Sequence, residues 1–149
     1  MEYDKLEFET TFKNGDMIPV EYTGYGKNIS PEFRIKNLSD KAKSLVIILE
    51  DLSHPIKNFT HWIAWNIKAN SVIPENVGNM DNVMQGIAYG FHKYAGAKPP
   101  KFQKHNYKYT IYSLDNILEL SSNIMKKKLL KAMDGHILQK GTIIGYFKR

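Results

Sequence analysis

The 149-residue sequence predicts a mainly β protein, a β-sandwich with a peripheral helix, in one domain that covers residues 1–149. Three observations favour this fold class. Most apolar stretches are short and either alternate with a period of two or are rich in β-branched residues, which is typical of strands. Clusters of Gly, Pro and Asn separate these stretches as turns. Only one stretch, towards the C-terminus, has a helical period.

The N-terminal part is predicted to hold short strands between polar loops. Residues 6–12 alternate between apolar and polar side chains, which indicates a half-exposed strand. Residues 14–16, Asn-Gly-Asp, predict a turn, and residues 18–22 predict a short edge strand, where Pro19 is tolerated. The glycine-containing stretch at residues 24–31 is expected to be a loop.

The middle of the chain predicts two apolar strands and then a long loop. Residues 45–49 are a continuous aliphatic run, whose shortness and β-branching favour a strand covered on both faces over a helix. This strand ends at Glu50 and Asp51, so carboxylates lie where it emerges. Residues 62–67 predict the second strand. Residues 71–90 have no sustained period, and a loop of this length in a compact domain is a candidate functional segment.

The C-terminal part predicts two more strands with a helix between them. Residues 105–113 alternate clearly, which predicts a strand, and residues 141–147 predict the last strand. A helix is expected over residues 124–134, with Gly135 as its C-terminal cap. Its apolar positions recur at i, i+4 and i+8: Met125, Leu129 and Met133.

The composition limits the classes of function. A net charge of +6 and a pI near 9.3 favour anionic partners. The lysines at 126–128 and 131 are expected to be a solvated helix face, because the aromatic residues follow strand patterns instead of interleaving with a basic stripe, so nucleic acid is not an expected partner. The absence of cysteine excludes thiol chemistry and is compatible with the cytoplasm. Residues 1–7 are charged and resemble no secretory signal, and no transmembrane segment is expected.

Two loops rich in Pro or Gly each lead into a strand that begins with a histidine, His61 or His105. If these two strands lie side by side, both histidines, Tyr107 and Asp51 converge on one pocket. The remainder of the chain would then be the scaffold of that pocket.

Several motifs together resemble the phosphatidylethanolamine-binding proteins, also called Raf kinase inhibitor-like proteins, in their bacterial or archaeal form. Each motif is weak alone, but their order and spacing are specific. They are Asn-Ile-Ser-Pro at 28–31, the acidic segment 50–55, His61-Trp62, Tyr94-x-Gly96 with Pro99-Pro100, His105-x-Tyr107, Tyr-Ser-Leu-Asp at 112–115 and the segment 130–138.

The resemblance implies an antiparallel β-sandwich with one or two short peripheral helices and a small pocket for phosphate-like anions or phospholipid headgroups. It implies no catalysis, no cofactor and no metal. The positions that match the family's pocket residues are Asp51, Pro55, His61, Gly96, Pro100, His105 and Tyr107.

The chain departs from the family pattern at several pocket positions. Ser53 stands where a second Asp is usual, and Lys98 takes a position that is normally small. Further departures are Leu52, His54, Ile87 and Ala97. Since Ser53 removes a negative charge and Lys98 adds a positive one, we expect both near the ligand and a stronger preference for anions than in the family pattern.

The residue types also predict a pH dependence. Imidazoles become cationic below about pH 6.5 and then donate from both ring nitrogens. If His61 and His105 hold an anion, binding therefore strengthens as the pH falls. Asp51 would repel a phosphate, so it is expected to orient a histidine or to bind a headgroup ammonium instead.

The main alternative is an enzyme, either a small hydrolase or a metal-dependent enzyme that uses His61, His105 and Asp51. Ser53 with His61 and Asp51 is nominally a catalytic triad, but no Gly-x-Ser-x-Gly turn surrounds the serine. A non-catalytic binding protein is therefore favoured. Modulation of a kinase or protease is a third interpretation, implied by the resemblance alone. A homodimer is a further expectation, formed through exposed aromatic side chains at Tyr89, Phe91 and Tyr94.

Overall fold

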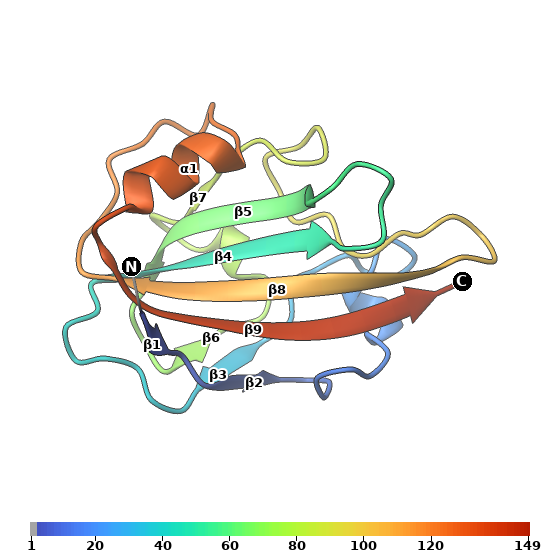
Figure 1. Cartoon of the computed structure of the whole chain (residues 1–149), viewed down its shortest axis with the longest axis horizontal. Helices are drawn as coiled ribbons and strands as arrows, with labels where there is room; N and C mark the ends of the chain where they lie inside the picture. Colours follow the sequence, from blue (N-terminus) through green and yellow to red (C-terminus); the bar gives the residue numbers. More distant parts are fainter. Residues whose placement is uncertain (1–2) are drawn as a thin grey trace.

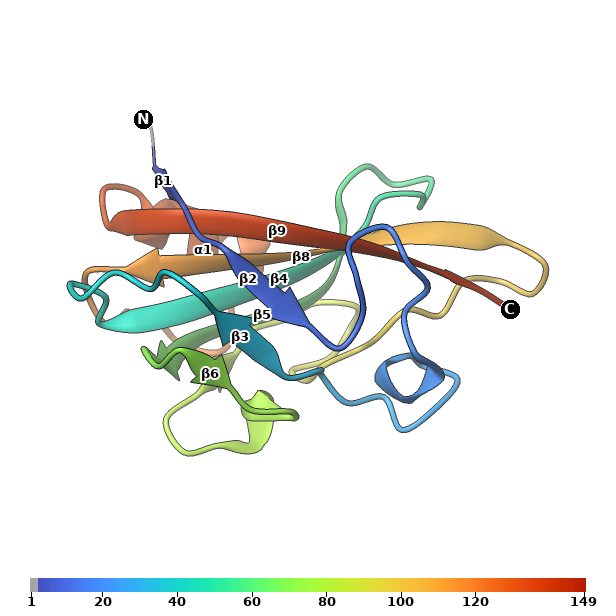
Figure 2. The same cartoon turned by 90° about the horizontal axis from the view of Figure 1, so that it is seen from below.

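The computed structural model describes residues 3–149, so the first two residues of the charged N-terminal segment lie outside the described part. A large sheet with the strand order β1-β9-β8-β4-β5-β7 packs on a small sheet with the order β2-β3-β6 (Figures 1 and 2). The strands are β1 Asp4–Lys5, β2 Phe8–Thr10, β3 Phe33–Ile35, β4 Ser44–Asp51, β5 Phe59–Lys68, β6 Val72–Ile73, β7 Met84–Gln85, β8 Lys104–Leu114 and β9 Ile137–Lys148. Every pair is antiparallel except β1 with β9, which is parallel. The predicted mainly β sandwich is confirmed.

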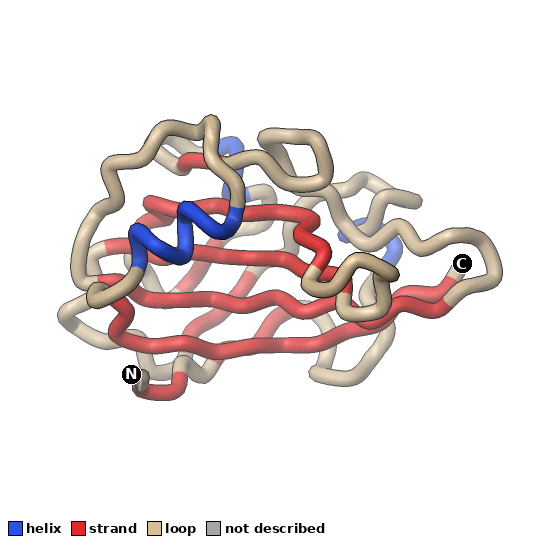
Figure 3. Tube along the Cα trace, turned by 45° about the horizontal axis from the view of Figure 1, so that its top comes forward, coloured by secondary structure: helices blue, strands red, loops and turns tan. Residues whose placement is uncertain are grey.

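The central strand β4 explains the continuous aliphatic run in the sequence. Leu45, Ile47 and Leu49 belong to the core between the two sheets. Val46 and Ile48 belong to a second core on the opposite face, which the helix α1 (Lys126–Met133) covers (Figure 3). Successive side chains of a strand point to opposite faces, so a strand that is buried on both faces must be apolar throughout. The prediction that this strand is covered on both sides is confirmed.

The strands that carry the two histidines are not neighbours. β4 lies between β5 and β8 and pairs with both, so the conditional expectation of adjacent strands is wrong. Nevertheless, Asp51 at the end of β4 lies opposite Phe59 of β5 and Tyr107 of β8. The end of β4 and the beginnings of its two neighbours therefore meet at the end of the sheet that is on the right in Figure 1.

The predicted edge strand at residues 18–22 is wrong. Residues Val20–Tyr22 form a short 3-10 helix, η1, in which the Tyr22 N–H donates to the Pro19 carbonyl at 3.0 Å. Pairing with β9 ends at the start of this segment, where Met17 forms an isolated bridge with Tyr146 and the Ile18 N–H donates to the Tyr146 carbonyl at 2.8 Å. Proline has no N–H for a strand ladder and its fixed φ suits a turn, which explains the difference.

The segment 71–90 contains more structure than the long loop that was expected. It holds β6, the 3-10 helix η2 (Val77–Asn79) and β7. These pieces are too short to show a period in the sequence.

The helix begins later than predicted, at Lys126. Met125 is its N-cap residue and is 64% exposed. Leu129 and Met133 are buried as expected, and Gly135 has φ +83° after the helix end. Lys126 is not simply solvated, because its Nζ lies 2.6 Å from Oε2 of Glu50. Within residues 3–149, the structure holds no helix of the length and apolarity that crossing a bilayer requires.

Candidate functional site

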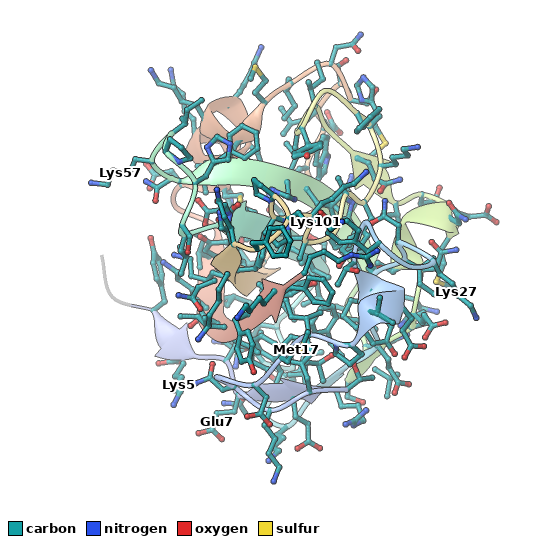
Figure 4. The ribbon with its side chains drawn as sticks, turned by 90° about the vertical axis from the view of Figure 1, so that its right-hand side faces the viewer. Lys5, Glu7, Met17, Lys27, Lys57 and Lys101 are labelled. Carbon is teal, nitrogen blue, oxygen red and sulfur yellow. The ribbon has the colours of Figure 1, made fainter. Side chains whose placement is uncertain are left out.

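A hollow of about 330 Å³ lies at the end of the sheet where β4 ends and β5 and β8 begin. Figure 4 looks at this end of the molecule and labels Lys57 and Lys101, from two of the loops there. The side chains that line the hollow come from the ends of three strands, from the loop between β4 and β5 and from the segment between β7 and β8: Asp51, His54, Pro55, His61, Tyr89, Lys98, Pro100, Gln103 and His105.

Asp51 is fixed by two hydrogen bonds. Its Oδ2 accepts from Nδ1 of His105 at 2.7 Å, and its Oδ1 accepts from the backbone N–H of Ser53 at 2.8 Å. Its side chain is 3% exposed. Because both oxygens have partners, the carboxylate holds His105 in one orientation, which is one of the two roles that the sequence left open.

The other ring nitrogen of His105, Nε2, lies 3.0 Å from Oε1 of Gln103. Gln103 belongs to the loop before β8 and also lines the hollow. A ligand that reaches this Nε2 must therefore displace the Gln103 amide.

His61 is anchored from the other side. Its Nδ1–H donates to the Ala95 carbonyl at 2.9 Å, with the Gly96 carbonyl at 3.2 Å. Burial lowers the pKa of His61 because it penalises the cation, and this outweighs the two carbonyls and Asp51, which act in the opposite direction. His61 is therefore neutral at pH 7, and its Nε2 carries a lone pair that no residue of the described part engages.

Tyr107 lies beneath the two imidazoles. Its ring centroid is 5.5 Å from that of His61 and 6.3 Å from that of His105. Its buried hydroxyl has no hydrogen-bond partner among residues 3–149, although the Lys98 backbone is nearby. Burial, reinforced by the Asp51 charge, raises the pKa of Tyr107 far above its ordinary value, so the hydroxyl keeps its proton and remains a donor.

Tyr89 covers His61 from a tight turn, with the two ring centroids 4.5 Å apart. Ala88 and Phe91 exchange two backbone hydrogen bonds, and Tyr89 and Gly90 between them have φ +55° and +76°. This is the geometry of a type I′ turn, in which a bulky residue at positive φ is rare and strained. The turn therefore holds an aromatic ring over the site at a conformational cost.

The structure brings together six of the predicted site residues around the hollow: Asp51, Pro55, His61, Lys98, Pro100 and His105. Three others do not line it. Ser53 uses its Oγ to accept from the Asn106 N–H at 2.9 Å, Gly96 contributes the carbonyl near His61, and Tyr107 lies underneath. Their contact with a ligand stays a prediction.

The sequence did not identify Tyr89, Gln103 or His54 as lining residues. His54 stacks on Phe59 with centroids 3.9 Å apart. The Tyr-Gly dipeptide within the unpatterned segment 71–90 was the available signal for the turn over His61. Nothing near Gln103 marks it in the sequence.

The geometry can supply hydrogen bonds and positive charge to a small ligand. Among residues 3–149, no three His, Asp or Glu side chains gather in an arrangement suited to a metal ion. Both oxygens of Asp51 already accept from protein donors. In the described part of the chain, the Lys98 ammonium and the Tyr107 hydroxyl are not paired with protein carboxylates or carbonyls, and Nε2 of His61 is free to take up a proton.

Comparisons with known proteins agree with this architecture. Residues 8–148 match the family model of the phosphatidylethanolamine-binding proteins. A UPF0098 protein of Pyrococcus horikoshii is 40% identical over 152 residues, which cover 97% of this chain and 77% of the relative. A UPF0098 protein of Methanothermobacter thermautotrophicus is 35% identical over 93% of this chain and 95% of its own length.

Solved structures are similar over nearly the whole chain. A crystal structure of a phosphatidylethanolamine-binding protein homologue from Chlamydia trachomatis has a TM-score of 0.86 and 31% identity, and the match covers 98% of this chain and 99% of that one. Escherichia coli YbcL also has a TM-score of 0.86, but at 20% identity over 97% and 99% of the two chains it supports the fold alone. The family-model match and these relatives show that the chain belongs to the phosphatidylethanolamine-binding protein family.

Proposed function

We propose that this protein is a non-catalytic binding protein whose hollow takes a phosphate-like anion, either free or as the phosphoryl group of a headgroup. One observation carries the proposal. His61 and His105 line the same hollow, and the Nδ1 of each is anchored to a protein oxygen. The Nε2 atoms are therefore the ring positions that can meet a ligand, directly at His61 and after displacement of the Gln103 amide at His105.

The charge balance of the hollow supports an anion. The single carboxylate in the lining, Asp51, already accepts from His105 and from the Ser53 N–H. Lys98 adds a positive charge, and the buried Tyr107 hydroxyl lacks a partner in the described chain. Charge-assisted hydrogen bonds from imidazolium and ammonium groups to phosphate oxygens are stronger than neutral ones. Protonation of His61 on binding would supply a further donor.

The lining supports binding without covalent catalysis. No Ser, Thr or Cys is among the residues that line the hollow. The hydroxyl of Ser53 accepts a backbone hydrogen bond and is not bonded to a histidine, so the Ser53-His61-Asp51 triad is not assembled. The Asp51–His105 pair orients an imidazole but has no adjacent nucleophile to activate.

The other predicted partners stay predictions. A carboxypeptidase Y inhibitor solved in complex with its cognate proteinase has a TM-score of 0.58 at 15% identity, which supports the fold alone. No contact in the described part of the chain favours a kinase or protease target, and a cytoplasmic location also stays a prediction. For the expected homodimer, Tyr89 and Phe91 are exposed, but Tyr94 is buried and donates to the Tyr22 carbonyl, so it cannot contribute to an aromatic patch.

Calorimetric titration of phosphate at pH 6.5 tests the proposal. The unmodified protein should bind, and His61→Ala and His105→Ala should each weaken binding about tenfold, since each removes a hydrogen bond to a charged group. His136→Ala is the matched control, because His136 is half-exposed and pairs with Asp115, which is not part of the hollow. A parallel titration with glycerophosphoethanolamine distinguishes a headgroup from the free anion. Equal affinity in all three variants would contradict the site.

A further inference from the structure

A second, smaller hollow adjoins the candidate site. It has a volume of about 190 Å³ and shares two of its lining residues, Tyr89 and Lys98, with the first hollow. Its other lining side chains include Asn28, Phe91 and Lys93. Because the same two side chains line both spaces, the two hollows are neighbours, with the Tyr89 ring and the Lys98 chain between them.

The second hollow is positively charged. Lys93 and Lys98 line it, and no Asp or Glu does. Neither ammonium forms an ion pair within residues 3–149. Lys93 Nζ lies 4.9 Å from the centroid of the Phe91 ring, and Lys98 Nζ lies 5.9 Å from that of Tyr25. Aromatic faces position these ammonium groups but do not neutralise their charge.

Asn28 adds a directed donor. It comes from the Asn-Ile-Ser-Pro loop, and its backbone has φ +58°. Its side-chain Oδ1 accepts from the Gly96 N–H at 2.7 Å, which fixes the amide and leaves its NH2 group as the part available to a ligand. The hollow therefore offers two ammonium groups and one amide donor. Its volume equals that of about six water molecules in the liquid, so it has room for a single polar group.

We propose that the second hollow is a subsite for a second anionic group of the same ligand. The ligand would then be a small molecule with a phosphoryl group in the first hollow and a carboxylate or second phosphate a few bonds away, beside Lys93 and Asn28. This inference rests on the proposed function, because the first hollow must hold the phosphoryl group. The size of the hollow and its two ammonium groups do not suit an acyl chain.

A matched pair of probes tests the second subsite: glycerol 3-phosphate and 3-phosphoglycerate, which differ in a hydroxymethyl group against a carboxylate. In calorimetry at fixed pH and about 0.1 M salt, the unmodified protein should bind 3-phosphoglycerate roughly three- to tenfold more tightly, as expected for one charge-assisted contact that is partly open to solvent. Lys93→Ala should reduce this ratio to about one.

Lys41→Ala is the control for net charge, because Lys41 is exposed, lines neither hollow, and its removal lowers the charge of the protein equally. It should keep the ratio of the unmodified protein. The subsite is overturned if the affinity ratio of the two probes is near one in the unmodified protein, or if Lys41→Ala reduces this ratio as much as Lys93→Ala does. In either case, phosphate binding would still support the first hollow. If neither probe nor phosphate binds, the proposed function and this inference both fail.

Discussion

Two neighbouring carboxylates at the end of β4, Glu50 and Asp51, point to opposite faces of the same sheet and have opposite surroundings. Glu50 faces α1, where Lys126 Nζ lies 2.6 Å from one of its oxygens and Lys108 Nζ lies 3.8 Å from the other. Asp51 faces the hollow, where its partners are the His105 ring and the Ser53 N–H. Both side chains are largely buried, at 12% and 3% exposure.

The difference distinguishes a carboxylate that stabilises the fold from one that orients a residue of the candidate site. Glu50 is neutralised by lysines that are already cationic, and Lys126 also donates to the Asn58 carbonyl at 3.0 Å, so this cluster ties the helix and a loop to the sheet. Asp51 instead orients an imidazole whose other edge faces a hollow. We therefore expect changes at Glu50 to affect stability and changes at Asp51 to affect binding.

Loss of the Glu50 carboxylate should destabilise the fold. Glu50→Ala should lower the free energy of unfolding by about 2 kcal/mol, because it leaves the partly buried Lys126 ammonium without its carboxylate. Urea denaturation measures this. Glu32→Ala is the comparison, since Glu32 pairs with Arg34 at the surface and 41% of its side chain is exposed. This substitution should lower the free energy of unfolding by less than about 1 kcal/mol. If Glu50→Ala reduced the free energy of phosphate binding as much as the free energy of unfolding, Glu50 and Asp51 would not have separate roles in stability and binding.

The next effect is on binding. Asp51→Asn keeps the shape of the side chain and an oxygen for the Ser53 N–H, but its amide NH2 would face Nδ1 of His105, so the ring could no longer hold a proton there. Phosphate affinity should fall about tenfold, or ~1.4 kcal/mol, because His105 would then offer only a neutral Nε2–H donor and not an imidazolium paired with the anion. Glu50→Gln is the isosteric control, which removes the adjacent charge and should leave the affinity unchanged. Equal losses in the two variants would show a general charge effect instead of an oriented imidazole.

The smallest effect is a pH dependence of stability. The folded protein holds His61 with a pKa below the 6.5 of the unfolded chain. At a pH between these two pKa values, the unfolded chain binds the proton more readily than the folded protein does. The free energy of unfolding therefore decreases as the pH falls below 6.5. His61→Asn keeps a donor near the Ala95 carbonyl but cannot titrate, and it should flatten this part of the profile. Urea denaturation from pH 7 to pH 5 checks it, with His136→Asn as the control. A bound anion should reverse the trend by favouring the imidazolium.

Much of the fold was predictable because strand and helix signals are local. The aliphatic run at 45–49 predicted a strand buried on both faces. The alternation at 105–113 predicted the strand in which His105, Tyr107 and Tyr109 are buried. The order of the strands was not predictable in this way. Pairing is set by contacts between segments far apart in the chain, so nothing local shows that β4 separates β5 from β8.

The candidate site was predictable where residues lie on strands and less so where they lie on loops. Asp51, His61 and His105 follow from strand ends, whereas Tyr89 and Gln103 reach the hollow from turns whose course depends on backbone conformation. Ser53 was expected in the pocket, but its Oγ accepts from the Asn106 N–H. These two residues are 53 positions apart in the chain, and a single sequence does not reveal such a long-range contact.

An NMR spectrum of the histidine ring nitrogens during addition of phosphate at pH 7 decides whether the hollow at the end of β4 holds an anion. The chain has five histidines, so each ring can be followed with ¹⁵N-histidine labelling. We predict that Nε2 of His61 moves from the acceptor range towards the protonated range, that the ring nitrogens of His105 move with the same saturation curve, and that His136 stays constant. If the rings of His61 and His105 do not respond, or if all five respond alike, the hollow at the end of β4 is not the anion site.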